Sequence, residues 1–152
     1  MTSSGERFQN ALLDLASSGR MGTIVPGVPK VEVLAHVGEF DWCQEQRGPD
    51  PYVCLAGDVE FCFTTADILF YIAVEPPYPV ARLAMGESGR TPSGTEFTRL
   101  LLDRGETLEE CTPYTDSQIW LRILGSGVLI DITEEDRINC IMVSLPELPA
   151  GG

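Results

Sequence analysis

The stretch DVEFCFTTADILFYIAV, residues 58–74, contains the clearest structural signal in the 152-residue chain. From Val59 to Phe63, large apolar residues alternate with polar or small ones, which is typical of a β-strand with one buried face. The polar residues TTAD at 64–67 interrupt this pattern, and an apolar run follows at 68–74. The stretch therefore predicts two antiparallel strands joined by a tight turn, in a sheet with one face in the core and one in water.

A second stretch, GVLIDITEEDRINCIMV at 127–143, matches the first when the sequence is shifted by 69 positions. The shift aligns Asp67 with Asp136, and several valine, threonine and isoleucine positions also coincide. Each stretch is preceded by a helical pattern of related sequence, FQNALLD at 8–14 and FTRLLLD at 97–103. These matches predict two related helix-plus-β-meander halves, and chance similarity between two amphipathic hairpins is the alternative.

Periodicity and turn residues divide the rest of the chain into helices and short strands. Apolar residues at helical spacing predict helices at 5–18, 29–37 and 94–104, although 29–37 also fits a strand. A loop is expected at 38–51 and a Gly/Ser-rich link at 86–95. Strands are expected at 52–56, 58–64, 68–74, 80–85, 106–112, 118–123, 128–132 and 138–144.

These elements predict an α+β fold with an antiparallel sheet and helices covering one of its faces. The length of the chain is typical of one domain, so we expect a single domain over 1–152 with internal halves at about 5–85 and 93–144. The uncovered face of the sheet would be left for contact with another molecule.

The charge of the chain excludes several classes of partner. Twenty-three acidic residues against ten basic ones give a formal net charge of −13, which repels phosphate backbones and anionic lipids. Binding to nucleic acid or to a membrane is therefore not expected, and the sequence contains neither a signal-peptide pattern nor a long apolar span. The five cysteines are odd in number and lie mostly in apolar stretches, which favours reduced thiols and a cytoplasmic location.

The residue types needed for catalysis or metal binding form no recognisable motif. His36 is the single histidine, and its spacing from Glu39 and Asp41 matches no metal-ligand signature, which favours a structural or exposed histidine. Asp58 and Glu60 share one strand face, as a glycosidase pair would, but exposed strand faces commonly carry such charges. We expect no metal, no cofactor and no enzymatic activity; a small hydrolase using His36 with a carboxylate or a cysteine is the alternative.

The acidic residues are densest in the second half of the chain. Unpaired like charges destabilise a folded protein, so this excess predicts a partner of opposite sign, with solubility as the alternative explanation. The expected partner-binding residues are Glu106, Glu109, Glu110, Asp116, Asp131, Glu134, Glu135 and Asp136.

The stretch LAGDVEFCF at 55–63 resembles a motif of the form Leu-x-Tyr-Gly-Asp-(Val/Ile/Leu)-Glu-Phe-x-Phe, which occurs in a class of small bacterial proteins. The resemblance covers residues 21 to about 75 and includes the short helix with its flanking turns, PGVPKVEVLAHVG at 26–38. Two features depart from the class: alanine replaces tyrosine before Gly57, and the loop after the helix lacks Gly-Pro-Pro. The resemblance implies a role as an immunity or antitoxin-like protein.

The motif can also be interpreted as a hairpin without reference to any family. Gly57 would form the turn, Phe61 and Phe63 would fill the core, and Asp58 and Glu60 would face water. We therefore hypothesise a non-enzymatic acidic protein, a monomer or a small homo-oligomer, that binds a basic protein partner such as a toxin. A self-associating structural module, in which edge strands pair between copies, is a further alternative.

Overall fold

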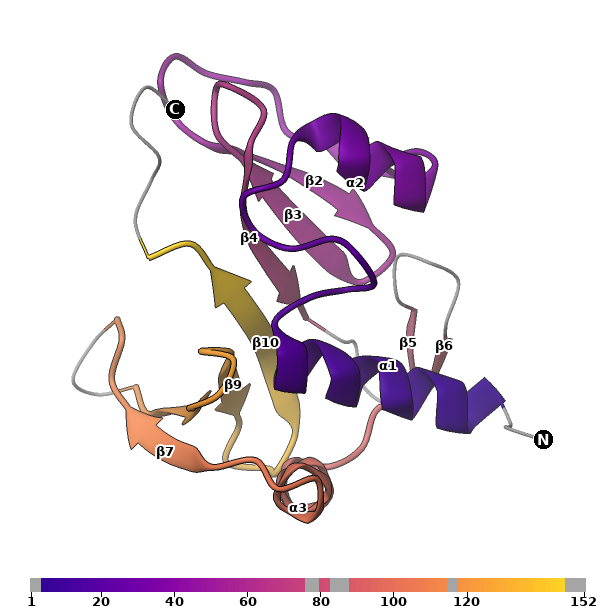
Figure 1. Cartoon of the computed structure of the whole chain (residues 1–152), viewed down its shortest axis with the longest axis vertical. Coiled ribbons are helices and arrows are strands. Elements are labelled where there is room, and N and C mark those ends of the chain that lie inside the picture. Colours follow the sequence, from indigo (N-terminus) through magenta and orange to yellow (C-terminus); the bar gives the residue numbers. More distant parts are fainter. Residues whose placement is uncertain (1–3, 76–79, 83–87, 115–117, 147–152) are drawn as a thin grey trace.

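A computed structural model of the chain describes residues 4–75, 80–82, 88–114 and 118–146 (Figure 1). These described residues form three helices, an eight-stranded antiparallel sheet and a separate two-stranded hairpin, so the fold is α+β as the sequence predicts. The helices are α1 (Ser4–Ser18), α2 (Lys30–Val37) and α3 (Gly94–Asp103). The strands are β1 (Trp42–Cys43), β2 (Tyr52–Ala56), β3 (Val59–Phe63), β4 (Leu69–Val74), β5 (Val80–Arg82), β6 (Ser88–Arg90), β7 (Leu108–Cys111), β8 (Trp120–Ile123), β9 (Leu129–Ile132) and β10 (Ile138–Ser144).

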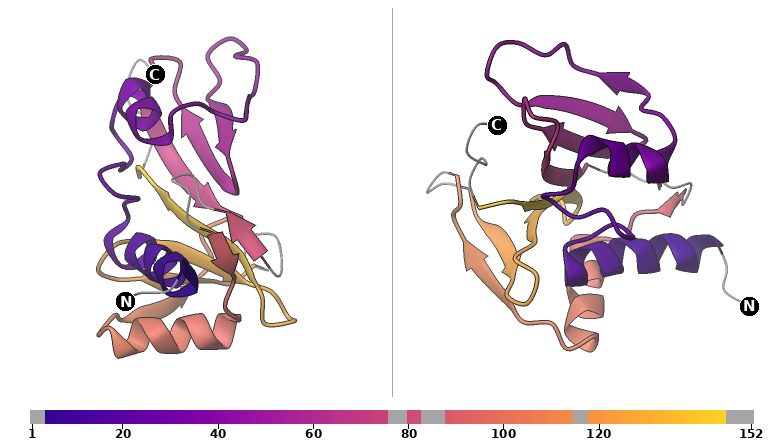
Figure 2. Two further views of the ribbon diagram at one scale, coloured as in Figure 1. Left: turned by 90° about the vertical axis from the view of Figure 1, so that its right-hand side faces the viewer. Right: turned by 45° about the horizontal axis from the view of Figure 1, so that its top comes forward.

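The strand order of the large sheet is β1-β2-β3-β4-β10-β9-β8-β7. The first four strands follow chain order, and the remaining four run back from β10 to β7. The two sets meet where β4 pairs with β10, with Ala73 opposite Met142 near the middle of the pairing (Figure 2). Two antiparallel meanders are thereby joined into one sheet along β4 and β10.

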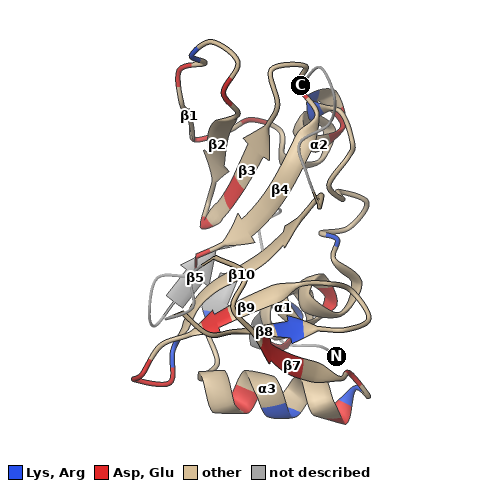
Figure 3. Cartoon of the chain, turned by 90° about the vertical axis from the view of Figure 1, so that its left-hand side faces the viewer, with Lys and Arg blue, Asp and Glu red and all other residues tan. Residues whose placement is uncertain are grey.

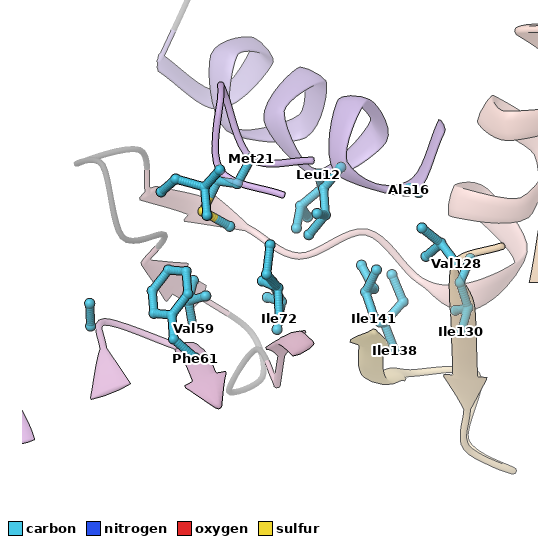
Figure 4. Packing of buried hydrophobic residues seen from close by; sticks show 14 of the residues in the cluster. Leu12, Ala16, Met21, Val59, Phe61, Ile72, Val128, Ile130, Ile138 and Ile141 are labelled. Carbon is cyan, nitrogen blue, oxygen red and sulfur yellow. The ribbon is translucent and has the colours of Figure 1, made fainter. Parts of the chain in front are cut away.

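Helix α1 supplies one side of the hydrophobic core. Its apolar residues recur at helical spacing, and Leu12 and Ala16 are completely buried. In Figure 4 these side chains face Ile72 of β4, Ile141 of β10 and Val128, which precedes β9. The helix therefore packs over the junction of the two meanders rather than over one of them.

The ends of the helices follow from local chemistry. Helix α2 begins after Pro29 and ends at Gly38, whose φ of 85° suits glycine, so the competing strand interpretation of 29–37 is wrong. Helix α3 has the predicted N-cap, in which Ser93 Oγ accepts the Glu96 N–H at 3.1 Å. Among the described residues, no helix combines the length and the apolar character needed to cross a bilayer.

The hairpin predicted around Gly57 is confirmed. Strands β2 and β3 pair along their whole length, and Gly57 has a φ of 60°, which glycine adopts without a steric penalty. Phe61 and Phe63 are completely buried, whereas Asp58 and Glu60 are partly exposed. The motif at 55–63 is thus a structural hairpin in this chain.

Two tight turns, one in each meander, have the same backbone geometry. Asp67 lies between β3 and β4 with a φ of 59°, and Asp136 lies between β9 and β10 with a φ of 63°. Aspartate tolerates this left-handed region better than most residues do. The Asp67 carbonyl accepts the backbone N–H of Lys30, and the Asp136 carbonyl accepts that of Gly94, both at 2.8 Å. Each turn therefore fixes the start of a helix against the sheet.

Two expectations for the connecting segments are wrong. The segment 38–51, expected to be a loop, contains β1, and the link at 86–95 contains β6. The strand expected at 80–85 forms β5, which pairs with β6 in the separate hairpin instead of extending the sheet. Strands of two or three residues are too short for alternation to reveal them. The described residues leave out positions 1–3, 76–79, 83–87, 115–117 and 147–152. Asp116 and part of the strand expected at 80–85 fall within these ranges.

The short strand β1 also changes the state of two cysteines. Cys43 lies directly opposite Cys54 of β2, and the two form a disulfide with their Cα atoms 4.0 Å apart. Cys62, Cys111 and Cys140 are free. The expectation of five reduced thiols is therefore wrong for this pair, because nothing in the sequence indicated the strand that brings Cys43 to Cys54.

Candidate docking surface

The acidic residues predicted to bind a partner lie on three elements of the second meander rather than in one cluster. Glu106 precedes the edge strand β7, which contains Glu109 and Glu110, while Asp131 lies in β9. Residues 134–136 form the β9–β10 turn. Figure 3 shows acidic segments on β7, on β9 and at the tip of this turn.

Two of these carboxylates have polar partners on neighbouring strands. Glu109 Oε1 lies 3.6 Å from Arg122 Nη1, and both side chains are largely exposed. Asp131 Oδ2 accepts a hydrogen bond from Asn139 Nδ2 at 2.8 Å. Exposed ion pairs contribute little to stability, so these groups remain available to a binding partner.

Asp136 has a structural role that the sequence did not indicate. Its Oδ1 accepts the backbone N–H of Thr95 at 2.9 Å, and its carbonyl accepts that of Gly94 at 2.8 Å. A carboxylate at the first turn of a helix is stabilising, because it satisfies free N–H groups and interacts with the helix dipole. Asp136 therefore anchors α3, and this structural role explains the carboxylate without any binding protein.

The sheet face opposite α1 carries a second, smaller apolar cluster. Side chains alternate along a strand, so Ala73 and Met142 point away from the core that contains Ile72 and Ile141. We call this set the outer cluster: Tyr71, Ala73, Cys111, Tyr114, Trp120, Leu129, Cys140 and Met142. The expectation that this face is covered only by water is wrong at its centre, where Ala73, Trp120 and Cys140 are buried.

Two aromatic residues dominate the outer cluster. The rings of Tyr114 and Trp120 meet edge to face with centroids 5.4 Å apart, and Tyr114 Oη lies 3.2 Å from Met142 Sδ. Tyr114 is 55% exposed, and the buried Trp120 Nε1 has no hydrogen-bond partner among the described residues. A half-exposed tyrosine beside a tryptophan is typical of the anchors found at protein interfaces.

Carboxylates surround the outer cluster. Glu60 of β3 accepts a hydrogen bond from the Tyr71 hydroxyl, and Glu75 follows β4 on the same face. Asp131 of β9 lies on this face as well, since its neighbour Ile130 points into the core. Figure 3 views this side of the sheet, with acidic segments on β3 and β9.

Four groups on this face, Cys62, Tyr71, Glu75 and Cys140, have a raised pKa and hold their protons more tightly than usual. Burial raises the pKa of Cys140 to about 12 and that of Cys62 to about 11, and neighbouring carboxylates add to both shifts. Burial and a hydrogen bond to Glu60 raise the pKa of Tyr71, while burial and the charge of Glu60 raise the pKa of Glu75. Burial is the largest cause of all four shifts, and the neighbouring carboxylates add a negative field that favours positive charge at this surface.

His36 does not take part in this surface. It lies exposed on α2, and its Nε2 is hydrogen-bonded to Thr23 Oγ1. Glu39 and Asp41 are also exposed, and within the described part of the chain no three His, Cys, Asp or Glu residues are arranged to hold a metal ion. This placement does not favour the alternative of a hydrolase that uses His36 in a pocket.

No protein-family model, no curated protein and no solved structure matches this chain. The resemblance at 55–63 to immunity-like bacterial proteins stays a prediction. The candidate docking surface therefore rests on the contacts and charges of the chain itself.

Proposed function

We propose that this chain is a non-enzymatic acidic protein that binds a basic protein partner, as an immunity or antitoxin-like protein does. The docking surface is the outer cluster with the carboxylates around it. The observation that carries this proposal is the convergence of Glu60, Glu75 and Asp131 on the buried centre of the outer cluster, where all three carboxylates act on Cys140.

The composition of the surface supports binding to a protein rather than to a small ion. Interfaces commonly combine an apolar centre with a polar rim, and their largest energetic contributions come from aromatic anchors. Tyr114 and Trp120 supply such anchors, and Glu60, Glu75 and Asp131 supply an acidic rim. Lysine and arginine side chains of a partner would pair with this rim while its apolar groups covered the aromatic rings.

The charge on the edge strand β7 supports the same proposal. Glu109 and Glu110 stand on the outermost strand of the sheet, where charge discourages strand pairing between copies of the chain. The same charges would accelerate the encounter with a basic partner. We therefore favour a monomer that meets its partner over the alternative of a self-associating module.

We also propose that the two meanders arose by duplication and that the helices cover one face of the sheet. Each half then contains a helix followed by four strands, and the order of the sheet places the two edge strands, β1 and β7, in equivalent positions. The turns at Asp67 and Asp136, which bind the starts of α2 and α3, are the strongest support. They make α2, rather than α1, the counterpart of α3.

The cellular compartment stays a prediction. The cytoplasmic location was inferred from cysteines expected to be reduced, and the Cys43–Cys54 disulfide is instead typical of oxidising compartments. Fractionation of the source cells, with detection by an antibody raised against this chain, would decide between the cytoplasm and an oxidising compartment.

The test of the function uses the effector protein encoded beside this chain, provided that it is basic. We expect a pull-down to recover the complex in dilute salt, added salt to weaken it, and co-expression to relieve the toxicity of the effector. The triple variant Glu60→Gln, Glu75→Gln, Asp131→Asn should bind at least about tenfold more weakly than the wild type.

The matched control removes the same number of charges elsewhere, through Glu32→Gln, Glu39→Gln and Glu45→Gln, which are all exposed. If the control variant loses binding as strongly as the outer-face variant, the docking surface is wrong and only the net charge matters. If no complex forms even in dilute salt, the proposed function itself is wrong.

A further inference from the structure

A polar cavity of about 740 Å³ lies where α1, the β6–α3 connection and the β9–β10 turn meet. Its wall contains Glu6 of α1, Arg90 at the end of β6, Thr91 of the connection and Glu135 of the turn. The volume is within the range of cavities that bind small molecules. No residue of the outer cluster or of its acidic rim lines it, so it is separate from the docking surface.

Thr91 gives the wall of this cavity a buried hydroxyl group without a partner. Its side chain is 6% exposed, and its Oγ1 makes no hydrogen bond to any of the described residues. Buried polar groups almost always have hydrogen-bond partners, and an exception is a place where a partner from outside the chain is expected. A hydroxyl can serve such a partner both as donor and as acceptor.

Most charged groups of the wall are already engaged within the chain. Glu96 forms an ion pair along α3 at 2.8 Å, and Asp136 accepts a backbone N–H at the start of that helix. Glu6 and Arg137 also have partners. The N-terminus of α3 is occupied as well, since Ser93 Oγ accepts the third N–H there, so this helix end does not offer a free anion site.

Two opposite charges of the wall have no such partner. The Arg90 guanidinium and the Glu135 carboxylate line the same cavity, and neither forms an ion pair with another described residue. A simple anion would pair with Arg90 but would be repelled by Glu135. A simple cation would pair with Glu135 and leave Arg90 unpaired. A ligand that carries both charges satisfies both groups.

We propose that this cavity binds a free α-amino acid. The carboxylate of the ligand pairs with the Arg90 guanidinium, whose planar fork matches a carboxylate. The ammonium group of the ligand pairs with Glu135, and a rotation of the Thr91 side chain brings its enclosed Oγ1 to one of the two groups. The cavity has room for a side chain beyond them. This site adds a small-molecule ligand to a chain whose proposed function is protein binding, and neither proposal depends on the other.

The test measures binding to the full chain by two-dimensional NMR titration at millimolar concentration. The probes are glycine, L-glutamine, L-glutamate and L-arginine, with propionate and propylamine as ligands that carry only one of the two charges. We expect at least one amino acid to shift the amide signals of residues 90–96 and 134–137. We expect propionate and propylamine to bind at least about tenfold more weakly than that amino acid.

Three variants locate the site. Arg90→Gln, Glu135→Gln and Thr91→Val should each weaken binding of that amino acid about tenfold. Arg47→Gln and Glu45→Gln, which change exposed charges in the segment between α2 and β2, should leave it unchanged. Arg90 and Glu135 are exposed, so their variants report on binding even if the Thr91 variant folds poorly.

Three results would overturn the proposal. The first is the absence of any shift with all four amino acids. The second is propionate or propylamine binding as tightly as the amino acids, which would make the cavity a site for a single charge. The third is an equal loss of binding in the Arg47 and Glu45 control variants.

Discussion

Gly94, at the first position of α3, is constrained by close approach and not by its backbone angles. A Cβ atom at this position would overlap Ile132 Cγ2 and lie 2.8 Å from Asp136 Oδ1, so β9 and the turn that follows it would have to move. The start of α3 is held against the sheet by this contact and by the hydrogen bond from Gly94 N to the Asp136 carbonyl.

We therefore expect Gly94→Ala to lower the free energy of unfolding by about 1–3 kcal/mol, because the added methyl group overpacks a rigid contact. Gly125→Ala is the matched control, since its Cβ would meet only Glu106 Oε2 at an ordinary 3.5 Å, and should change stability by less than about 0.5 kcal/mol. Urea unfolding measures both. Equal stability of the two variants would contradict the close packing of α3.

The two buried threonines of the described residues differ in what their hydroxyl groups do. Thr64 Oγ1 accepts the backbone N–H groups of Ala66 and Ile68 at 3.3 and 3.2 Å, whereas Thr91 Oγ1 has no partner among the described residues. Thr64→Val should therefore lower the free energy of unfolding by about 1–3 kcal/mol, whereas Thr91→Val should leave it unchanged or raise it. Thermal or urea unfolding of the two variants checks this. A large loss for Thr91→Val would mean that its hydroxyl is satisfied within the chain.

At the scale of single elements, the disulfide ties the edge strand β1 to β2. The bond joins two cysteines that are 11 positions apart in the sequence. Reduction should therefore lower the free energy of unfolding by about 2–3 kcal/mol. Thiol titration of the denatured, unreduced chain should find the three free cysteines, Cys62, Cys111 and Cys140. Five titratable thiols in protein purified without reductant would contradict the bond.

The elements that the sequence predicted well are those with a long repeating pattern. The helices and the strands of both meanders were predicted to within about two residues at most ends, because burial on one face imposes a period on their residues. Strand β1, strand β6 and the pairing of β6 with β5 were missed, because two or three residues carry no period. The partner of Cys43 was missed with them.

The candidate site was only partly predictable for a related reason. Acidic residues on β7 and β9 were recognisable from composition, but the outer cluster was not. Trp120 and Cys140 look like ordinary residues of exposed strand positions until β8, β9, β10 and β4 are placed side by side. The role of Asp136 was hidden as well, since its contact with Thr95 joins residues 41 positions apart.

At the scale of the whole molecule, the partial burial of Glu75 close to the charge of Glu60 makes stability depend on pH. Its pKa is raised by burial and by the charge of Glu60, so the folded state binds this proton more tightly than the unfolded state does. The charged form therefore destabilises the fold at neutral pH, and this penalty disappears as the pH falls through the raised pKa.

Glu75→Gln should consequently be more stable than the wild type at neutral pH, by about 0.2–1 kcal/mol at most, since Glu75 is exposed. The difference should shrink when both proteins are unfolded near the ordinary pKa of glutamate. Glu32→Gln, at another exposed glutamate on α2, is measured beside it as the matched control. A constant difference at all pH values would contradict the repulsion between Glu75 and Glu60.

The packing of α1 over β4 and β10 bears on how the protein is made. Leu12 of α1 faces Ile141 of β10, and the other helices and strands of the described chain are synthesised between the two. The apolar stripe of α1 therefore stays without this part of its cover on the nascent chain until β10 has emerged. Chaperone capture during synthesis should accordingly concentrate on the α1 segment.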